Sequence, residues 1–123
     1  MGTFNSNDEL TEVKLGKGIE SIDAYAFHGC INITEIDILE NCKIIKYVAF
    51  ADCSIEHLII PNTVEKVENR AFENNEKLKT ILIESRNTDI GKQSFANCGN
   101  LRRINYNESE IKSRIAKLFK KRQ

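Results

Sequence analysis

The stretch LIIPNTVEKVENRAFENN, residues 58–75, is one copy of a repeat that runs through most of this chain. Its Phe72 recurs at intervals of 23, 22 and 23 residues, each time after a small residue and three residues before Cys or Asn. The repeated positions are Phe27, Phe50, Phe72 and Phe95, followed by Cys30, Cys53, Asn75 and Cys98. One such unit cannot bury its own apolar face, so this period indicates a solenoid of stacked coils.

An apolar frame accompanies each repeated phenylalanine. In the first coil Val13 and Leu15 alternate with polar residues, which is typical of a short half-buried strand. After a Gly-rich turn, Ile19 and Ile22 begin a second extended segment. In later coils the position of Ile19 is taken by Cys42, Val64 and Asn87. We therefore predict two short strands per coil, with the four Phe side chains in one buried column.

The third copy, from Leu58 through Pro61 to Phe72, resembles the BspA-type leucine-rich repeat, and the resemblance covers residues 10–106. Proteins of this family are parallel-strand solenoids found mostly as surface or adhesive proteins. From the phase of the repeat together with this resemblance we predict a leucine-rich repeat solenoid, a right-handed parallel β-solenoid of about four and a half coils of 22–23 residues with a C-terminal capping helix. The expected domains are an N-terminal tail at 1–9, the solenoid at 10–106, and a basic amphipathic helix at 107–123.

The C-terminal segment differs from the rest of the chain in charge and pattern. Residues 1–110 hold all 18 acidic residues and 12 basic ones, whereas residues 111–123 hold six basic residues. Apolar residues recur there at helical spacing, after Asn107-x-x-Glu110, which is similar to a capping box. We expect a helix from about Glu108 to Lys121 to cap the last coil. A basic segment for an anionic membrane surface or for nuclear import is the alternative.

The N-terminal segment offers little to cover the first coil. Phe4 is its only large apolar group besides Met1. We therefore expect the first coil to expose Leu15 and Ile22, unless Phe4 folds back as a lid. An uncovered coil favours a homodimer through the N-terminal coil, because unpaired strand groups act as a template for another chain.

The outward positions of the first strands form a strip whose character changes from acidic to apolar to basic. Ile59 and Leu82 are expected to be adjacent and exposed, which indicates a contact point. Scattered exposed aliphatic residues are nevertheless common on protein surfaces. The candidate protein-binding residues are Glu35, Asp37, His57, Ile59, Thr80, Leu82 and Arg103.

Charges on the second segments alternate from coil to coil and are expected to favour the correct stacking. The equivalent positions are Glu20, Lys43 and Glu65, and, three residues on, Asp23, Lys46 and Glu68.

Three of the four cysteines take the repeat position that Asn75 fills, and Cys42 takes an aliphatic position. We therefore predict buried, reduced thiols, which suit a reducing compartment. The sequence has no Cys-x-x-Cys pair, the short spacing typical of zinc ligands, so no zinc site is predicted.

No catalytic, metal or cofactor site is predicted. His28 and His57 have no recurrent carboxylate or hydroxyl partner in the sequence, and His28 is expected to be a solvated surface residue. The acidic body disfavours nucleic acid as a partner. The sequence therefore predicts a non-enzymatic protein–protein interaction module with an extended repeat surface. The alternatives are a surface adhesin fragment that binds host or matrix proteins, and a membrane-anchored intracellular scaffold.

The expected location is cytoplasmic, with membrane association or, for an adhesin fragment, the cell surface as alternatives. Met1-Gly2-x-x-x-Ser6 fits the pattern for myristoylation of Gly2, although a Gly in this position is also a common cloning remnant. An acyl chain on Gly2 and the basic tail would together give the two signals that stable membrane anchoring requires. Asn32 and Asn107 begin glycosylation sequons, which matter only for a secreted chain.

Overall fold

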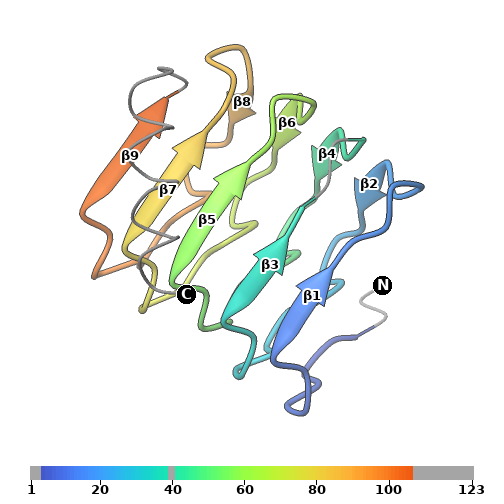
Figure 1. Cartoon of the computed structure of the whole chain (residues 1–123). Coiled ribbons are helices and arrows are strands. Elements are labelled where there is room, and N and C mark those ends of the chain that lie inside the picture. The colour runs from blue at the N-terminus through green and yellow to red at the C-terminus, as the bar shows by residue number, and fades with distance from the viewer. Residues whose placement is uncertain (1–3, 39–40, 107–123) are drawn as a thin grey trace, which may run out of the picture.

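The computed structural model describes residues 4–38 and 41–106, which form a parallel β-solenoid of about four coils (Figure 1). Each coil contributes one strand to a first row and one to a second row. The first row is β1 (Glu12–Lys14), β3 (Glu35–Asp37), β5 (His57–Ile60), β7 (Thr80–Ile83) and β9 (Arg103–Tyr106). The second row is β2 (Ser21–Ile22), β4 (Ile44–Ile45), β6 (Lys66–Val67) and β8 (Asp89–Ile90). The predicted leucine-rich repeat fold is confirmed.

The strand pairs are all parallel, and equivalent repeat positions face one another. The second row is one continuous sheet in the order β2-β4-β6-β8. The first row is divided into a β1-β3 pair and a β5-β7-β9 sheet. The division coincides with a shorter turn, since Cys53 and Ile55 are separated by one residue where Cys30 and Ile33 are separated by two. Backbone hydrogen bonds still join the second and third coils at this turn, from the N–H of Ser54 to the carbonyl of Ile33 and from the N–H of Glu56 to the carbonyl of Thr34.

The phenylalanines form the predicted column along the core. The rings of Phe27, Phe50, Phe72 and Phe95 stack with centroid separations of 5.0, 5.4 and 5.5 Å and are nearly parallel. Phe50 and Phe72 are fully buried, and Phe95 is half-buried at the last complete coil. The column joins the Ile, Leu and Val side chains of the two strand rows into one continuous core.

Backbone hydrogen bonds between coils change direction around each coil. At the Phe turns the earlier coil donates: the N–H of Phe27 donates to the carbonyl of Ala49, and that of Phe72 to Ser94. Before the first-row strands the later coil donates: the N–H of Lys79 donates to the backbone carbonyl of Glu56, and the N–H of Arg102 to the backbone carbonyl of Lys79. Each coil therefore both gives and accepts bonds on each of its two faces.

The Phe turns require left-handed backbone conformations. The first position, two residues before Phe, is left-handed in three coils, with φ of 62° to 63° at Tyr25, Val48 and Arg70. The second position, two residues after Phe, is left-handed in all four coils. The second position is Gly29, Asp52, Asn74 or Asn97, with φ from 58° to 74°. Gly, Asn and Asp tolerate this conformation, whereas a β-branched residue such as Val48 is strained in it.

The segment expected to be a tail contains part of a further Phe turn. Phe4 lies 23 residues before Phe27, and its ring stacks on that of Phe27 at a centroid distance of 5.2 Å. The N–H groups of Phe4 and Ser6 donate to the carbonyls of Ala26 and His28, as in the complete coils. Ser6, with φ of 58°, takes the left-handed position. Of the two expectations for Phe4, the structure shows the ring folded over the first coil.

Two expectations about apolar positions are wrong. In the fourth coil Thr88, not Asn87, occupies the buried position of Val64, because its side chain can donate to the Val64 carbonyl while Asn87 extends into solvent. In the first coil Ile22 is buried, at 3% exposure, and belongs to the core cluster. Ile19 is exposed there instead, and Leu15 is half-buried.

One of the expected charge contacts on the second segments is present, the ion pair of Lys46 Nζ with Asp23 Oδ1 at 3.6 Å. Glu68 instead accepts a hydrogen bond from the backbone N–H of Tyr47. The predicted capping helix at 107–123 lies outside the described residues.

Candidate functional site

The first strand row presents the candidate binding strip. Glu35 and Asp37 on β3 and Arg103 on β9 are exposed on its outer face. Between them the register of β5 and β7 pairs His57 with Thr80 and Ile59 with Leu82. We call the outward residues Glu35, Asp37, His57, Ile59, Thr80 and Arg103 the strand face.

The centre of the strand face is ordered by a side-chain contact between coils. His57 Nδ1 lies 2.7 Å from Thr80 Oγ1, and both side chains are half-buried. Beside them Ile59 is 38% exposed, which is high for an aliphatic residue inside a sheet. This contact also corrects the expectation that His57 has no hydroxyl partner, because stacking brings together residues 23 positions apart.

Leu82 does not belong to the exposed strip, and the expectation that it does is wrong. Its side chain is only 2% exposed, between the buried Ile81 and Ile83. Three successive buried residues cannot all face one side of a strand, so both faces of β7 are covered at this point. The apolar part of the strand face is therefore Ile59 alone.

The cysteines are buried and unpaired, as predicted. The thiol of each repeat cysteine donates to the carbonyl of the Phe in the preceding coil, as Cys53 does to Phe27 at 3.3 Å and Cys98 to Phe72 at 3.4 Å. Asn75 makes the same contact with Phe50 through Nδ2 at 2.9 Å. Burial raises the pKa of all four thiols, and that of Cys53 to about 12. These thiols stay protonated near neutral pH and serve as hydrogen-bond donors.

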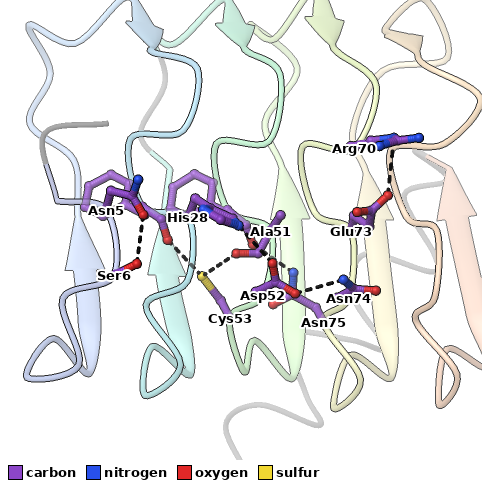
Figure 2. A network of polar contacts seen from close by, with 12 residues as sticks. Asn5, Ser6, His28, Ala51, Asp52, Cys53, Arg70, Glu73, Asn74 and Asn75 are labelled. Atoms are coloured by element: carbon purple, nitrogen blue, oxygen red, sulfur yellow. Dashed lines mark hydrogen bonds and ion pairs between the residues drawn. The ribbon is translucent and has the colours of Figure 1, made fainter. Parts of the chain in front are cut away.

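A row of polar side chains crosses three coils at the Phe turns (Figure 2). His28 Nε2 lies 2.9 Å from Asp52 Oδ2, and Asn74 Nδ2 donates to Asp52 Oδ1 at 2.8 Å. The expectations that His28 lacks a carboxylate partner and is simply solvated are wrong, because left-handed Asp52 turns its side chain toward the neighbouring coil. His28 and Asp52 are 24 residues apart in the sequence, one more than the 23-residue repeat, so the repeat did not indicate their contact.

The shortened turn after Cys53 leaves a hollow of about 390 Å³ beside this row. Ser54 stands where the first coil has Ile31 and Asn32. The hollow is lined by Ile31, Asp52, Cys53, Ser54, Asn74, Glu76 and Lys77, which come from three successive coils. Sequence reasoning missed it, although the 22-residue interval between Phe50 and Phe72 marks the coil that is short.

Among residues 4–38 and 41–106, no group of three or more His, Cys, Asp and Glu side chains could hold a metal ion. In this same part of the chain, no helix has the length and apolarity needed to cross a bilayer. Gly2, the candidate for lipidation, lies outside the described residues.

Two solved structures share this architecture. A leucine-rich cell surface protein from Faecalibacterium prausnitzii is 28% identical, with a TM-score of 0.80 over 90% of this chain and 30% of the other. A leucine-rich repeat protein from Bacteroides ovatus is 24% identical, with a TM-score of 0.79 over 85% of this chain and 27% of the other, and shows the fold alone. This chain thus spans less than a third of each. A search of curated proteins finds no match.

The pattern of a BspA type leucine-rich repeat region matches residues 1–122 in six copies. The six copies correspond to the partial turn that contains Phe4, the four complete coils, and the coil that begins with the final strand β9. The chain belongs to the BspA-type leucine-rich repeat family.

Proposed function

We propose that this solenoid is a non-catalytic protein-interaction module that contacts its partner through the strand face. The family is typically one of protein-interaction and surface proteins, and its fold is typically non-enzymatic. The observation that carries the proposal is Ile59, an exposed aliphatic side chain beside the ordered His57–Thr80 contact. A central apolar residue with a polar rim is the usual anatomy of a protein interface.

The charges of the strand face support a directional contact. Glu35 and Asp37 lie on the N-terminal side of Ile59, and Arg103 lies two coils beyond it on the C-terminal side. A partner with the opposite order of charges would bind in one orientation, because complementary charges raise the rate of association and disfavour other orientations.

The test is quantitative capture from the source cells with immobilised wild-type protein and two matched variants. Ile59→Asp should remove the specific partner, whereas Tyr47→Asp should retain it, since Tyr47 is similarly exposed but lies outside the strand face. Arg103→Glu should weaken capture in a salt-dependent manner. A captured set that is the same with Ile59→Asp and Arg103→Glu as with wild type would refute the proposal.

The second candidate is a fragment of a surface adhesin that binds a host or matrix protein. The Faecalibacterium structure, described as a cell surface protein, favours it. Protease treatment of intact source cells separates this candidate from a cytoplasmic module or a scaffold anchored through Gly2. Surface exposure predicts loss of the protein from intact cells, whereas mass spectrometry of the native N-terminus would reveal an acyl group on Gly2.

A homodimer through the N-terminal coil stays a further proposal. Phe4, whose ring stacks on that of Phe27, is 44% exposed, and Ile19 of the first coil is 39% exposed. Sedimentation at increasing concentration should show association that Leu15→Glu abolishes. A protein that stays monomeric at high concentration would leave Phe4 as the cover of the first coil.

A further inference from the structure

We propose that the hollow at the shortened turn is a second interaction site, and that it receives a lysine side chain from a protein partner. The hollow and the strand face lie on different parts of the coil, one beside the Phe turns and the other on β3 to β9. The proposal therefore stands on observations of its own. The hollow has a volume of about 390 Å³ and is open to solvent, so a side chain of a partner can reach it from outside.

The carboxylate of Asp52 is held in position before any ligand arrives. His28 lies against one of its oxygens and Asn74 donates to the other, at 2.9 and 2.8 Å. The Asp52 side chain nevertheless remains 40% exposed, and it lines the hollow. Since each carboxylate oxygen has two lone pairs, Asp52 can accept a further charged donor without losing its present partners.

The walls of the hollow suit the aliphatic stem of a lysine. Ile31 is 57% exposed at one wall and supplies apolar surface against which methylene groups can pack. Cys53 at the hollow is a neutral thiol, since its pKa is about 12. Glu76 adds a second carboxylate at the rim, and Lys77 lies beside it.

The existing contacts of Asp52 favour lysine over arginine. A guanidinium binds a carboxylate best as a two-pronged fork that engages both oxygens in one plane. His28 and Asn74 already engage the two oxygens from opposite coils. A compact ammonium needs only one free lone pair, so it fits this carboxylate with less rearrangement.

The experiment is a titration of the ¹⁵N-labelled chain with Nα-acetyl-lysine-N-methylamide at physiological salt, followed by amide chemical shifts. The lysine probe should shift the amides of Ser54, Asn74 and Glu76. The norleucine analogue, which has the stem without the ammonium, and the arginine analogue should both bind several-fold more weakly. Equal binding of the norleucine analogue would overturn the site, and equal binding of the arginine analogue would overturn its assignment to lysine.

Variants separate this site from general attraction to acidic surface. Asp52→Asn should weaken lysine binding by about tenfold or more, because a charged hydrogen bond is lost. Asn is the residue at the equivalent left-handed positions 74 and 97, so the turn accepts it. Glu65→Gln, the same change of charge at an exposed residue outside the hollow, should leave binding unchanged. Ile31→Ala should weaken binding through the lost wall, and Lys77→Glu should strengthen it.

Unchanged binding in folded Asp52→Asn, or equal loss in Glu65→Gln, would refute the proposal. Ile59→Asp should leave lysine binding intact. Failure of the lysine site and failure of the strand face are therefore distinguishable.

Discussion

At the scale of single residues, the Phe column and the close approach of the turns decide how much change the solenoid tolerates. Phe50 and Phe72 are fully enclosed by rings above and below, whereas Phe95 is half-buried. Gly91 lies against the backbone of the preceding coil, whereas Gly99 has open space around it. Chemically identical substitutions should therefore have different effects at different coils.

Phe72→Ala should lower the free energy of unfolding by about 3–5 kcal/mol, because it removes a buried ring and leaves a cavity between two stacked rings. Phe95→Ala should cost less, since its ring is half-buried. Urea unfolding followed by circular dichroism measures both. Equal losses in the two variants would contradict the enclosed column.

Gly91→Ala should destabilise the fold by about 1–3 kcal/mol, the usual range for overpacking. The new Cβ would lie 2.5 Å from Asn69 Oδ1 and 2.8 Å from the Asn69 backbone nitrogen. Gly99→Ala is the control and should change stability by no more than about 0.5 kcal/mol. Thermal unfolding of the two variants side by side tests the prediction, and a neutral Gly91→Ala would show that the neighbouring turn can move.

At the scale of the element, the Phe turn is the most constrained part of each coil. It combines left-handed residues with a side-chain donor that reaches the Phe carbonyl of the preceding coil. In the third coil Asn75 replaces the cysteine and makes more contacts. Its Nδ2 donates to the carbonyls of Phe50 and Phe72, and its Oδ1 accepts from the N–H of Ile55. The amide thus supports the strand that follows the shortened turn.

Asn75→Ala should cost about 1–3 kcal/mol, because it leaves these buried backbone groups without their partner. Asn75→Cys should cost less, since cysteine makes the carbonyl contact in three other coils. Hydrogen exchange of the Ile55 amide provides a local measure. It should accelerate in both variants, because neither Ala nor Cys supplies the acceptor; slow exchange in both would contradict the role assigned to Oδ1.

The repeat allowed the strands, the Phe column and the buried cysteines to be predicted, because these depend on positions that recur in phase. It did not allow the burial of Leu82 to be predicted, since alternation tells which face a side chain is on and not what covers that face. It also did not allow the contact of His28 with Asp52 to be predicted, because that contact joins two different positions of the repeat. Phe4 and the hollow were within reach of the sequence, through the 23-residue interval to Phe27 and the missing residue after Cys53.

At the scale of the whole molecule, the thiols link stability to pH. Burial raises the pKa of Cys30, Cys42, Cys53 and Cys98 above the ordinary value of 9.0. Above about pH 9 an unfolded chain loses thiol protons that the folded chain keeps, which favours unfolding. The stabilisation is therefore fully present below about pH 9 and, for Cys53, is lost progressively as pH rises towards 12.

The urea midpoint of the wild type should fall between about pH 8 and pH 10.5 by more than that of Cys53→Ala. The variant starts from a lower stability because of the lost side chain, so the comparison concerns the change with pH and not the absolute value. The same change with pH in both proteins would show that Cys53 is not a main source of the dependence.

The reversal of hydrogen-bond direction around each coil has an electrical consequence. In an α-helix all peptide groups point the same way, and a macrodipole arises that places partial charges at the two ends. Here the N–H groups at the Phe turns point towards the next coil, and those before the first-row strands point towards the previous one. Their contributions along the axis oppose each other, so stacked coils accumulate less field between the ends than they would if all these N–H groups pointed the same way.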